Sequence, residues 1–174
     1  SVRLPDDQAL GGRGTIDITP DGAFMVYEGH GADGESQLWI RRWALLDATP
    51  IAQTAGARAP AVSPSGTEVA FYRNDSLLVV HLGTGATRTA ASRTGAGSPR
   101  WSADSRWLYR GNTEGAYRTP SRRGPVDTLV TGLNVWHAEP LPGGIGMVYA
   151  VLRGGEDFRI DALDFRSGET TVLV

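Results

Sequence analysis

Residues 59–90 read "APAVSPSGTEVAFYRNDSLLVVHLGTGATRTA", and this stretch decides the fold. Its Pro64-x-Gly66 step predicts a tight turn, because proline fixes φ at about −65° and glycine adopts a positive φ without strain. Short apolar runs flank the turn, and "SLLVVHL" and a Thr-rich run follow after further polar breaks. We therefore expect four short strands within roughly forty residues.

The same kind of turn occurs four times, and each copy precedes an apolar strand that ends in an aromatic residue. The turns are "TPDG" at 19–22, "SPSG" at 63–66, "SADS" at 102–105 and "LPGG" at 141–144, and the aromatic residues are Tyr27, Phe71, Tyr109 and Tyr149. A period of roughly 40 residues with four strands is typical of a β-propeller blade. A β-sandwich of unrelated hairpins would not keep this register. The sequence therefore predicts an all-β fold, a β-propeller of four four-stranded blades, as a closed four-blade ring or a partial propeller.

The repeat also predicts the organisation of the chain. Residues 1–14 form an N-terminal strand or extension, and residues 15–174 form the propeller, with blades at approximately 15–54, 55–92, 93–131 and 132–174. We expect the aromatic residues after the turns to be buried, together with Trp39 and Val79 of the third strands. If the blades form an open arc, its uncovered ends predict an oligomer or a bound partner.

Composition excludes several functional classes. The 174 residues include no cysteine, which excludes a disulfide framework and thiolate chemistry. The net charge of −2 gives no broad basic field, so we expect no nucleic-acid partner. No apolar run approaches the ~20 residues that a membrane span requires. Because the sequence begins at Ser1, we expect that a leader or an upstream segment has been removed.

The stretches "SPRWSADSRWLYRG" and "DITPDGAFMVYEG", the latter followed by "QLWIRR", resemble the TolB-type, WD-repeat-like β-propeller family. The resemblance covers residues 15–174 and implies a periplasmic or extracytoplasmic protein that acts in binding or assembly. The stretch "DATPIAQTAGARAPAVSPSG" is also similar to the propeller ectodomains of some bacterial receptor Ser/Thr kinases. No kinase motif occurs in this chain. The family's members usually have six or more blades, whereas this chain has four repeats.

Catalytic and metal-binding patterns do not stand out. His30, His81 and His137 are scattered without metal-ligand spacing, and no serine lies in a nucleophile elbow. Asp17 and Glu139 on first strands are the strongest acidic candidates for an enzyme. We expect neither catalysis nor a cofactor nor a metal site.

The binding surface is predicted from hairpin length. The segments between second and third strands are longest at 28–37 and 151–158, and such loops share one face of a propeller with the connections between blades. Exposed loops on a rigid scaffold commonly carry binding residues. We expect a protein partner to contact residues from these hairpins and connections: His30, Asp33, Glu35, Arg58, Arg93, Trp136, Arg153, Glu156 and Asp157.

The sequence favours a noncatalytic protein-binding propeller that acts as a scaffold or accessory subunit of an extracytoplasmic, membrane-associated complex. A ligand-sensing ectodomain of a bacterial receptor kinase is one alternative. A propeller-fold enzyme that acts on glycans is a second alternative, and it requires charged side chains that converge on one site.

Overall fold

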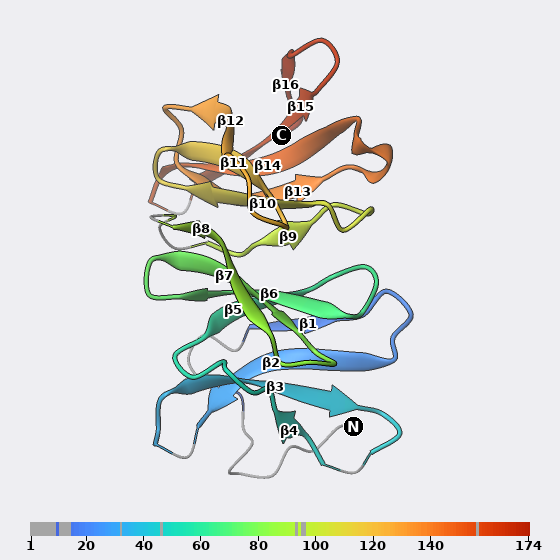
Figure 1. Ribbon diagram of the computed structural model, residues 1–174. Coiled ribbons are helices and arrows are strands. Elements are labelled where there is room, and N and C mark those ends of the chain that lie inside the picture. Colours follow the sequence, from blue (N-terminus) through green and yellow to red (C-terminus); the bar gives the residue numbers. More distant parts are fainter. Residues whose placement is uncertain are drawn as a thin grey trace. The chain divides into compact units, whose positions relative to one another are not determined.

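The computed structural model describes residues 10, 15–31, 33–45, 47–92, 94, 97–155 and 157–174. The chain divides into two compact units, residues 1–89 and 90–174. Each sheet has four strands that pair in chain order, and two sheets fall mainly in each unit (Figure 1). The boundary between the units lies within the last strand of the second sheet.

Two meandering sheets form the first unit. The first sheet contains β1 (Ile16–Ile18), β2 (Phe24–His30), β3 (Ser36–Arg42) and β4 (Thr49–Pro50). The second contains β5 (Arg58–Val62), β6 (Glu68–Arg73), β7 (Ser76–His81) and β8 (Thr87–Ser92). Their core joins Val26, Leu38 and Ile40 of the first sheet to Phe71 and Val80 of the second. Burial of these apolar side chains holds the two sheets together.

The second unit repeats this arrangement. The third sheet contains β9 (Arg100–Trp101), β10 (Trp107–Asn112), β11 (Gly115–Pro120) and β12 (Asp127–Thr131). The fourth contains β13 (Val135–Pro140), β14 (Gly146–Gly154), β15 (Asp157–Asp164) and β16 (Thr170–Val172). Tyr109 and Ala116 of the third sheet share a core with Met147, Tyr149 and Leu163 of the fourth.

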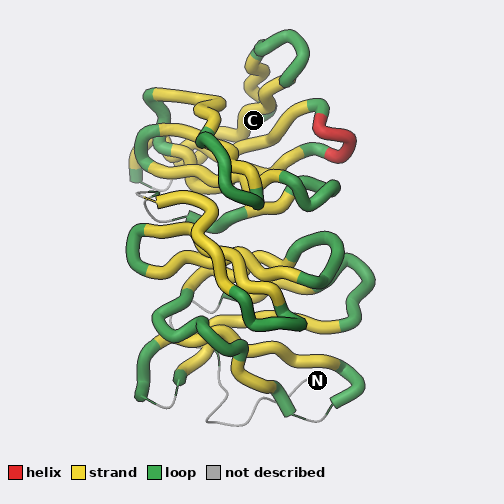
Figure 2. Tube along the Cα trace, in the orientation of Figure 1, coloured by secondary structure: helices red, strands yellow, loops and turns green. Residues whose placement is uncertain are grey.

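The predicted all-β propeller architecture of four four-stranded blades is confirmed. Within the described ranges, the helical structure is one 3-10 turn, η2 (Pro142–Gly144), which is red in Figure 2. The blade boundaries and the closure of the ring stay predictions. The N-terminal strand expected within residues 1–14 lies outside the described residues except for Leu10, which forms an antiparallel bridge with Gly29.

The burial of the aromatic residues after the turns is also confirmed. Tyr27 and Phe71 are fully buried, Tyr109 and Tyr149 are 2% exposed, and Val79 is fully buried. Trp39 is less completely buried than these residues, and it packs at the margin of a core cluster. Its indole Nε1 donates a hydrogen bond to the carbonyl oxygen of His30 at 3.1 Å, which holds the ring at the margin of the sheet.

A hydroxyl at the first position of the turn explains why three repeats share the motif. The backbone N–H five residues later donates to this hydroxyl in each case: Phe24 to Thr19 at 3.3 Å, Glu68 to Ser63 at 3.1 Å and Trp107 to Ser102 at 2.9 Å. Side-chain acceptors of this kind satisfy turn amides that no strand partner reaches. Gly66 takes a φ of 68° in its turn.

The fourth turn departs from this pattern. Leu141 replaces the hydroxyl residue, and the chain forms the 3-10 turn η2 before β14 begins. The backbone bond that closes the turn remains, with the Leu141 N–H donating to the Gly146 carbonyl at 2.9 Å. The hairpin closure therefore survives the loss of the side-chain cap.

The prediction of long loops at 28–37 and 151–158 is wrong, because most of these residues belong to strands. His30 pairs with Ser36 and Gly29 with Gln37, so β2 and β3 extend almost to the hairpin tip. In the fourth sheet, Leu152 pairs with Phe158. The additional residues lengthen the strands, because backbone pairing across a hairpin overrides the weak strand propensity of Gly29 and His30.

Candidate functional site

The tip of the β2–β3 hairpin carries three of the predicted binding residues. His30, Asp33 and Glu35 are all exposed. The Gly31 N–H donates to the Glu35 carbonyl at 2.7 Å, and the Glu35 N–H donates to Asp33 Oδ1 at 3.1 Å. These bonds position the described residues Gly31, Asp33 and Glu35 at the end of the hairpin.

The connection between the first two sheets lies against this hairpin. The Gly56 N–H donates to the Ser36 carbonyl at 2.7 Å, and Arg73 Nη1 donates to the Gln53 carbonyl at 3.3 Å. Arg58, at the start of β5, is exposed, and it pairs with Tyr72 of β6. Within the first unit, the connection thus lies beside both hairpins. We name His30, Asp33, Glu35, Arg58 and Arg73 the hairpin surface.

Sequence reasoning missed Arg73. It ends β6 directly before the Asn74-Asp75 turn. Its guanidinium reaches the connection at Gln53 from the neighbouring hairpin. The sequence signal that could have identified Arg73 is its charge, directly before a turn that lies beside the connection.

A second group of predicted residues lies in the fourth sheet. Trp136 is 47% exposed, and its ring meets Phe158 edge-to-face with centroids 5.9 Å apart. Arg153 and Asp157, also exposed, flank the tip of the β14–β15 hairpin. We name Trp136, Arg153, Asp157 and Phe158 the aromatic surface. Phe158 was not among the predicted site residues, although it is 45% exposed.

The connection between the third and fourth sheets repeats the arrangement of the first unit. The Gly132 N–H donates to the Glu114 carbonyl, and the Leu152 N–H donates to the Asn134 carbonyl, both at 2.8 Å. This places the connection against hairpins on both sides. Arg93 and Glu156 lie outside the described residues. The hypothesis that the hairpin and aromatic surfaces form one binding site stays a prediction.

The two acidic enzyme candidates are engaged in contacts with neighbouring sheets. Asp17 Oδ2 accepts a hydrogen bond of 2.7 Å from the Val62 N–H, and Oδ1 accepts one from the Ile18 N–H. The Glu139 carboxylate pairs with Arg100 Nε at 3.1 Å. Each carboxylate therefore ties the first strand of its own sheet to that of the adjacent sheet. Neither contact supplies the paired acids of a glycan-active enzyme.

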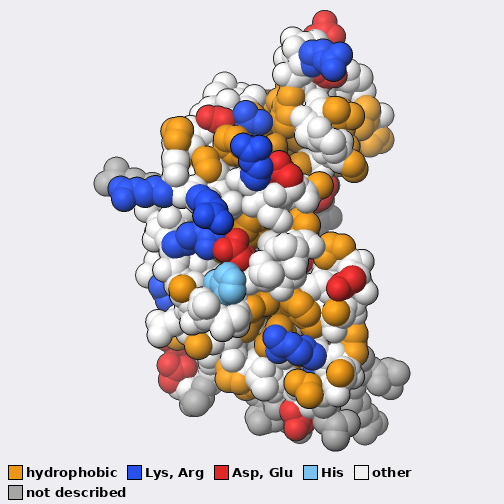
Figure 3. All heavy atoms as spheres, turned by 45° about the vertical axis from the view of Figure 1, so that its right-hand side comes forward, with side chains coloured by type: hydrophobic (Ala, Val, Ile, Leu, Met, Phe, Trp, Pro, Cys, Tyr) orange, Lys and Arg blue, Asp and Glu red, His pale blue; other side chains and the backbone are white. Residues whose placement is uncertain are grey.

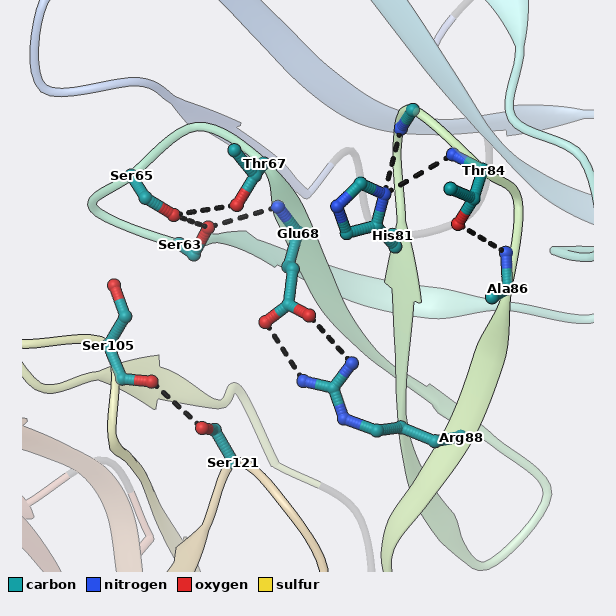
Figure 4. A network of polar contacts seen from close by, with 11 residues as sticks. Ser63, Ser65, Thr67, Glu68, His81, Thr84, Ala86, Arg88, Ser105 and Ser121 are labelled. Carbon is teal, nitrogen blue, oxygen red and sulfur yellow. Dashed lines mark hydrogen bonds and ion pairs between the residues drawn. The ribbon is translucent and has the colours of Figure 1, made fainter.

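A polar network in the second sheet is shown in Figure 4. Arg88 forms a two-pronged ion pair with Glu68, with N–O distances of 2.7 and 2.8 Å. Ser63, Ser65 and Thr67 share hydroxyl hydrogen bonds along the turn. His81 Nδ1 accepts hydrogen bonds from the Gly83 and Thr84 N–H groups, which closes the β7–β8 hairpin. These contacts stabilise turns and strand pairs.

The described histidines and acidic residues form no arrangement typical of a metal site. No group of three or more His, Cys, Asp or Glu side chains that could hold a metal ion occurs within the described ranges.

Asp161 is fully buried in the fourth sheet, and its carboxylate accepts hydrogen bonds of 2.8 and 2.7 Å from Arg159. Burial raises the pKa of the adjacent Tyr149 hydroxyl. The phenol therefore stays neutral at physiological pH.

The fold is that of TolB-like β-propellers. A protein assigned as TolB from Agrobacterium tumefaciens superposes with a TM-score of 0.79 at 17% identity, over 95% of this chain and 68% of the other. TolB from Acinetobacter baumannii gives a TM-score of 0.75 at 17% identity, over 95% of this chain and 45% of the other. This chain thus spans less than half of the second TolB.

Other similar structures come from peptidases. The β-propeller domain of the Trilobed protease from Pyrococcus furiosus gives a TM-score of 0.63 at 16% identity, over 92% of this chain and 57% of the other. No protein-family model matches the chain, and no curated protein matches it. At these identities the likeness defines the fold, and function has to be argued from the surfaces. In the part of the chain that the structure describes, no helix is long and apolar enough to cross a membrane.

Proposed function

We propose that this chain is a noncatalytic protein-binding propeller, a scaffold or accessory subunit of an extracytoplasmic, membrane-associated complex. The observation that carries the proposal is the Trp136–Phe158 pair on the aromatic surface. Two large aromatic rings lie nearly half exposed, with Arg153 and Asp157 at the adjacent hairpin tip. Tryptophan and arginine are enriched among the residues that dominate protein–protein binding energy.

The hairpin surface supports the same proposal. Its exposed His30, Asp33, Glu35 and Arg58 present both charge signs on a backbone that hydrogen bonds hold in place. A preorganised surface loses little conformational entropy when a partner binds. The extracytoplasmic location rests on the TolB-like fold and on the resemblance of the turn motifs to that family.

The test uses charge reversal on both surfaces. The double variant Asp33→Arg with Arg153→Glu keeps the fold, because both side chains are exposed at hairpin tips. Tagged wild-type and variant chains are expressed in the source cells, and proteins that co-purify after mild crosslinking are identified by mass spectrometry. We expect a specific partner with the wild type, and at least tenfold less of it with the variant.

A matched control reverses charge elsewhere. Asp47→Arg with Arg166→Glu changes two exposed charges in the β3–β4 and β15–β16 turns, outside both surfaces, and it should retain the partner. Equal loss of the partner in both double variants, or full retention of the partner by Asp33→Arg with Arg153→Glu, argues against binding through the two surfaces. Fractionation of the cells tests location separately, and a cytoplasmic chain contradicts that part of the proposal.

A further inference from the structure

Basic residues are concentrated in the third sheet, within the second unit. Residues 97–131 contain six arginines and three acidic residues, whereas residues 132–174 contain three arginines and six acidic residues. In Figure 3, several basic side chains gather on the visible face, at the height that the third sheet has in Figure 1. The two sheets of this unit therefore carry opposite net charges.

Three of these arginines lie at the end of the third sheet that carries its turns. Arg106 directly precedes β10, and Arg122 and Arg123 follow β11; all three are exposed. The Ser121 N–H donates to the Arg106 carbonyl at 2.8 Å. The Ser121 hydroxyl donates to the Ser105 carbonyl, also at 2.8 Å (Figure 4). These bonds join the two segments, and we name Arg106, Arg122 and Arg123 the arginine surface.

The segment that carries Arg122 and Arg123 is held in place on both sides. Ser121 bonds to the β9–β10 turn. Gly124 lies so close to Pro120 that an added Cβ would be 2.7 Å from the proline Cγ. A backbone that is packed in this way loses little conformational entropy when a ligand binds. The two neighbouring guanidinium groups therefore project from a preorganised segment.

The acidic residues at the same end of the sheet do not neutralise the arginine surface. None of the ion pairs formed among the described residues includes one of its three arginines. Asp127 is paired with Arg118 at 2.9 Å. The Asp104 carboxylate is engaged by its own turn, where it accepts hydrogen bonds from the Ser102 hydroxyl at 2.6 Å and the Arg106 N–H at 3.0 Å. One such carboxylate does not balance three guanidinium groups.

We propose that the arginine surface binds an acidic segment of a partner protein, through the carboxylates of its aspartate or glutamate side chains. A guanidinium group presents paired N–H donors that match both oxygens of a carboxylate. The interaction uses none of the residues of the hairpin and aromatic surfaces, so it adds a second kind of contact to the proposed function.

The fourth sheet argues against a broad anionic surface such as a lipid bilayer. Asp164 and Glu169 flank its β15–β16 turn, and both are exposed. This turn lies close to the third sheet, because the Phe165 ring centroid is 5.5 Å from Arg118 Cζ. A bilayer would bring its phosphates against these two carboxylates, whereas a narrow acidic segment reaches the arginines without contacting them.

The test measures binding of a fluorescein-labelled oligoglutamate peptide to the full chain by fluorescence anisotropy at low salt. We expect the wild type to bind this peptide, and an oligoglutamine peptide of the same length to stay free. Arg122→Gln with Arg123→Gln should weaken binding at least tenfold. Added salt should also weaken wild-type binding, because salt screens the attraction between exposed charges.

A matched control removes the same charge elsewhere. Arg42→Gln with Arg166→Gln changes two exposed arginines outside the arginine surface, and it should change binding less than twofold. NMR of the wild type locates the contact without a variant, since the peptide should shift the amide signals of the arginine surface more than those of Arg42 and Arg166.

Absence of peptide binding at low salt overturns the proposal, and so does an equal loss in the two double variants. Vesicles of phosphatidylglycerol test the lipid alternative. Co-sedimentation of the wild type with these vesicles, together with no peptide binding, would assign the surface to a membrane instead. The hairpin and aromatic surfaces stay intact in Arg122→Gln with Arg123→Gln, so failure of this proposal leaves the charge-reversal test of the proposed function unaffected.

Discussion

The two compact units use the same repeat but fill their interiors differently. The main core of the first unit has aliphatic side chains such as Val26 and Leu38 around Phe71, and Glu28 is a buried carboxylate in this unit. In the second unit, Tyr109 stacks on Phe165 with centroids 6.1 Å apart, and the Arg118 guanidinium lies 4.5 Å from the Trp107 ring. A fully buried Asp161 pairs with Arg159 as well.

Turn sequence and core composition change together between the units. Both turns of the first unit keep their proline and glycine, whereas "SADS" lacks both and "LPGG" lacks the hydroxyl. One blade architecture therefore tolerates two kinds of interior. We expect the first unit to be most sensitive to cavities, and the second to be more sensitive to the loss of charged and polar contacts.

The largest effect is expected in the first unit. Phe71→Ala removes a fully buried ring and should lower the free energy of unfolding by about 3–5 kcal/mol. Chemical denaturation followed by circular dichroism measures the loss. Phe158→Ala is the matched control, because its 45% exposed ring leaves no cavity, and it should cost less than about 1 kcal/mol. Similar losses in both variants would mean that the core is misplaced.

In the second unit, Arg159→Met should lower the free energy of unfolding by less than Phe71→Ala does, because it removes the ion pair of the buried Asp161 carboxylate. Denaturation at neutral pH measures the loss. Arg166→Met, at an exposed turn, controls for the removal of an arginine. If the two variants unfold at the same denaturant concentration, the ion pair does not stabilise this unit.

A smaller effect is expected at the third turn. Ser102→Ala removes the acceptor of the Trp107 N–H and should cost about 1–2 kcal/mol, whereas Thr113→Ala in an exposed turn should cost little.

The Ser102 hydroxyl, followed by the Arg106 N–H, holds the pKa of Asp104 below 3.8. Ionised Asp104 therefore adds stability above its unfolded-state pKa, and this contribution is lost as pH falls through the lower folded-state pKa. NMR titration should show the Asp104 pKa rising toward 3.8 in Ser102→Ala; an unchanged pKa contradicts the assignment.

The fold was predictable because the turn fixes the phase of each repeat. Once Gly66 closes its hairpin, the alternation along β6 places Phe71 in the core, and the same logic holds for Tyr27, Tyr109 and Tyr149. Hairpin length was not predictable by this route. Gly29, Ser36 and Gln37 look like loop residues, and only their pairing across the hairpin makes them strand.

The candidate site was predictable only in part. Trp136 and Arg153 were identified from their positions beside connections and tips, but the contact between Trp136 and Phe158 joins residues 22 positions apart in sequence. No local pattern encodes such a contact. Arg73 was missed for the same reason. Its hydrogen bond to the Gln53 carbonyl joins the β6–β7 hairpin to the connection between the first two sheets.

The most direct test of protein binding places a photo-crosslinking amino acid at position 136 in the source cells. Position 126 is the control, because Val126 is similarly exposed, at 42% against 47% for Trp136, but lies outside both surfaces. We predict that irradiation links position 136 to one defined protein and that position 126 gives no such product. In the Asp33→Arg with Arg153→Glu double variant, the crosslinked product at position 136 should be lost. Identical products from both positions, or no protein adduct at position 136, would contradict the account.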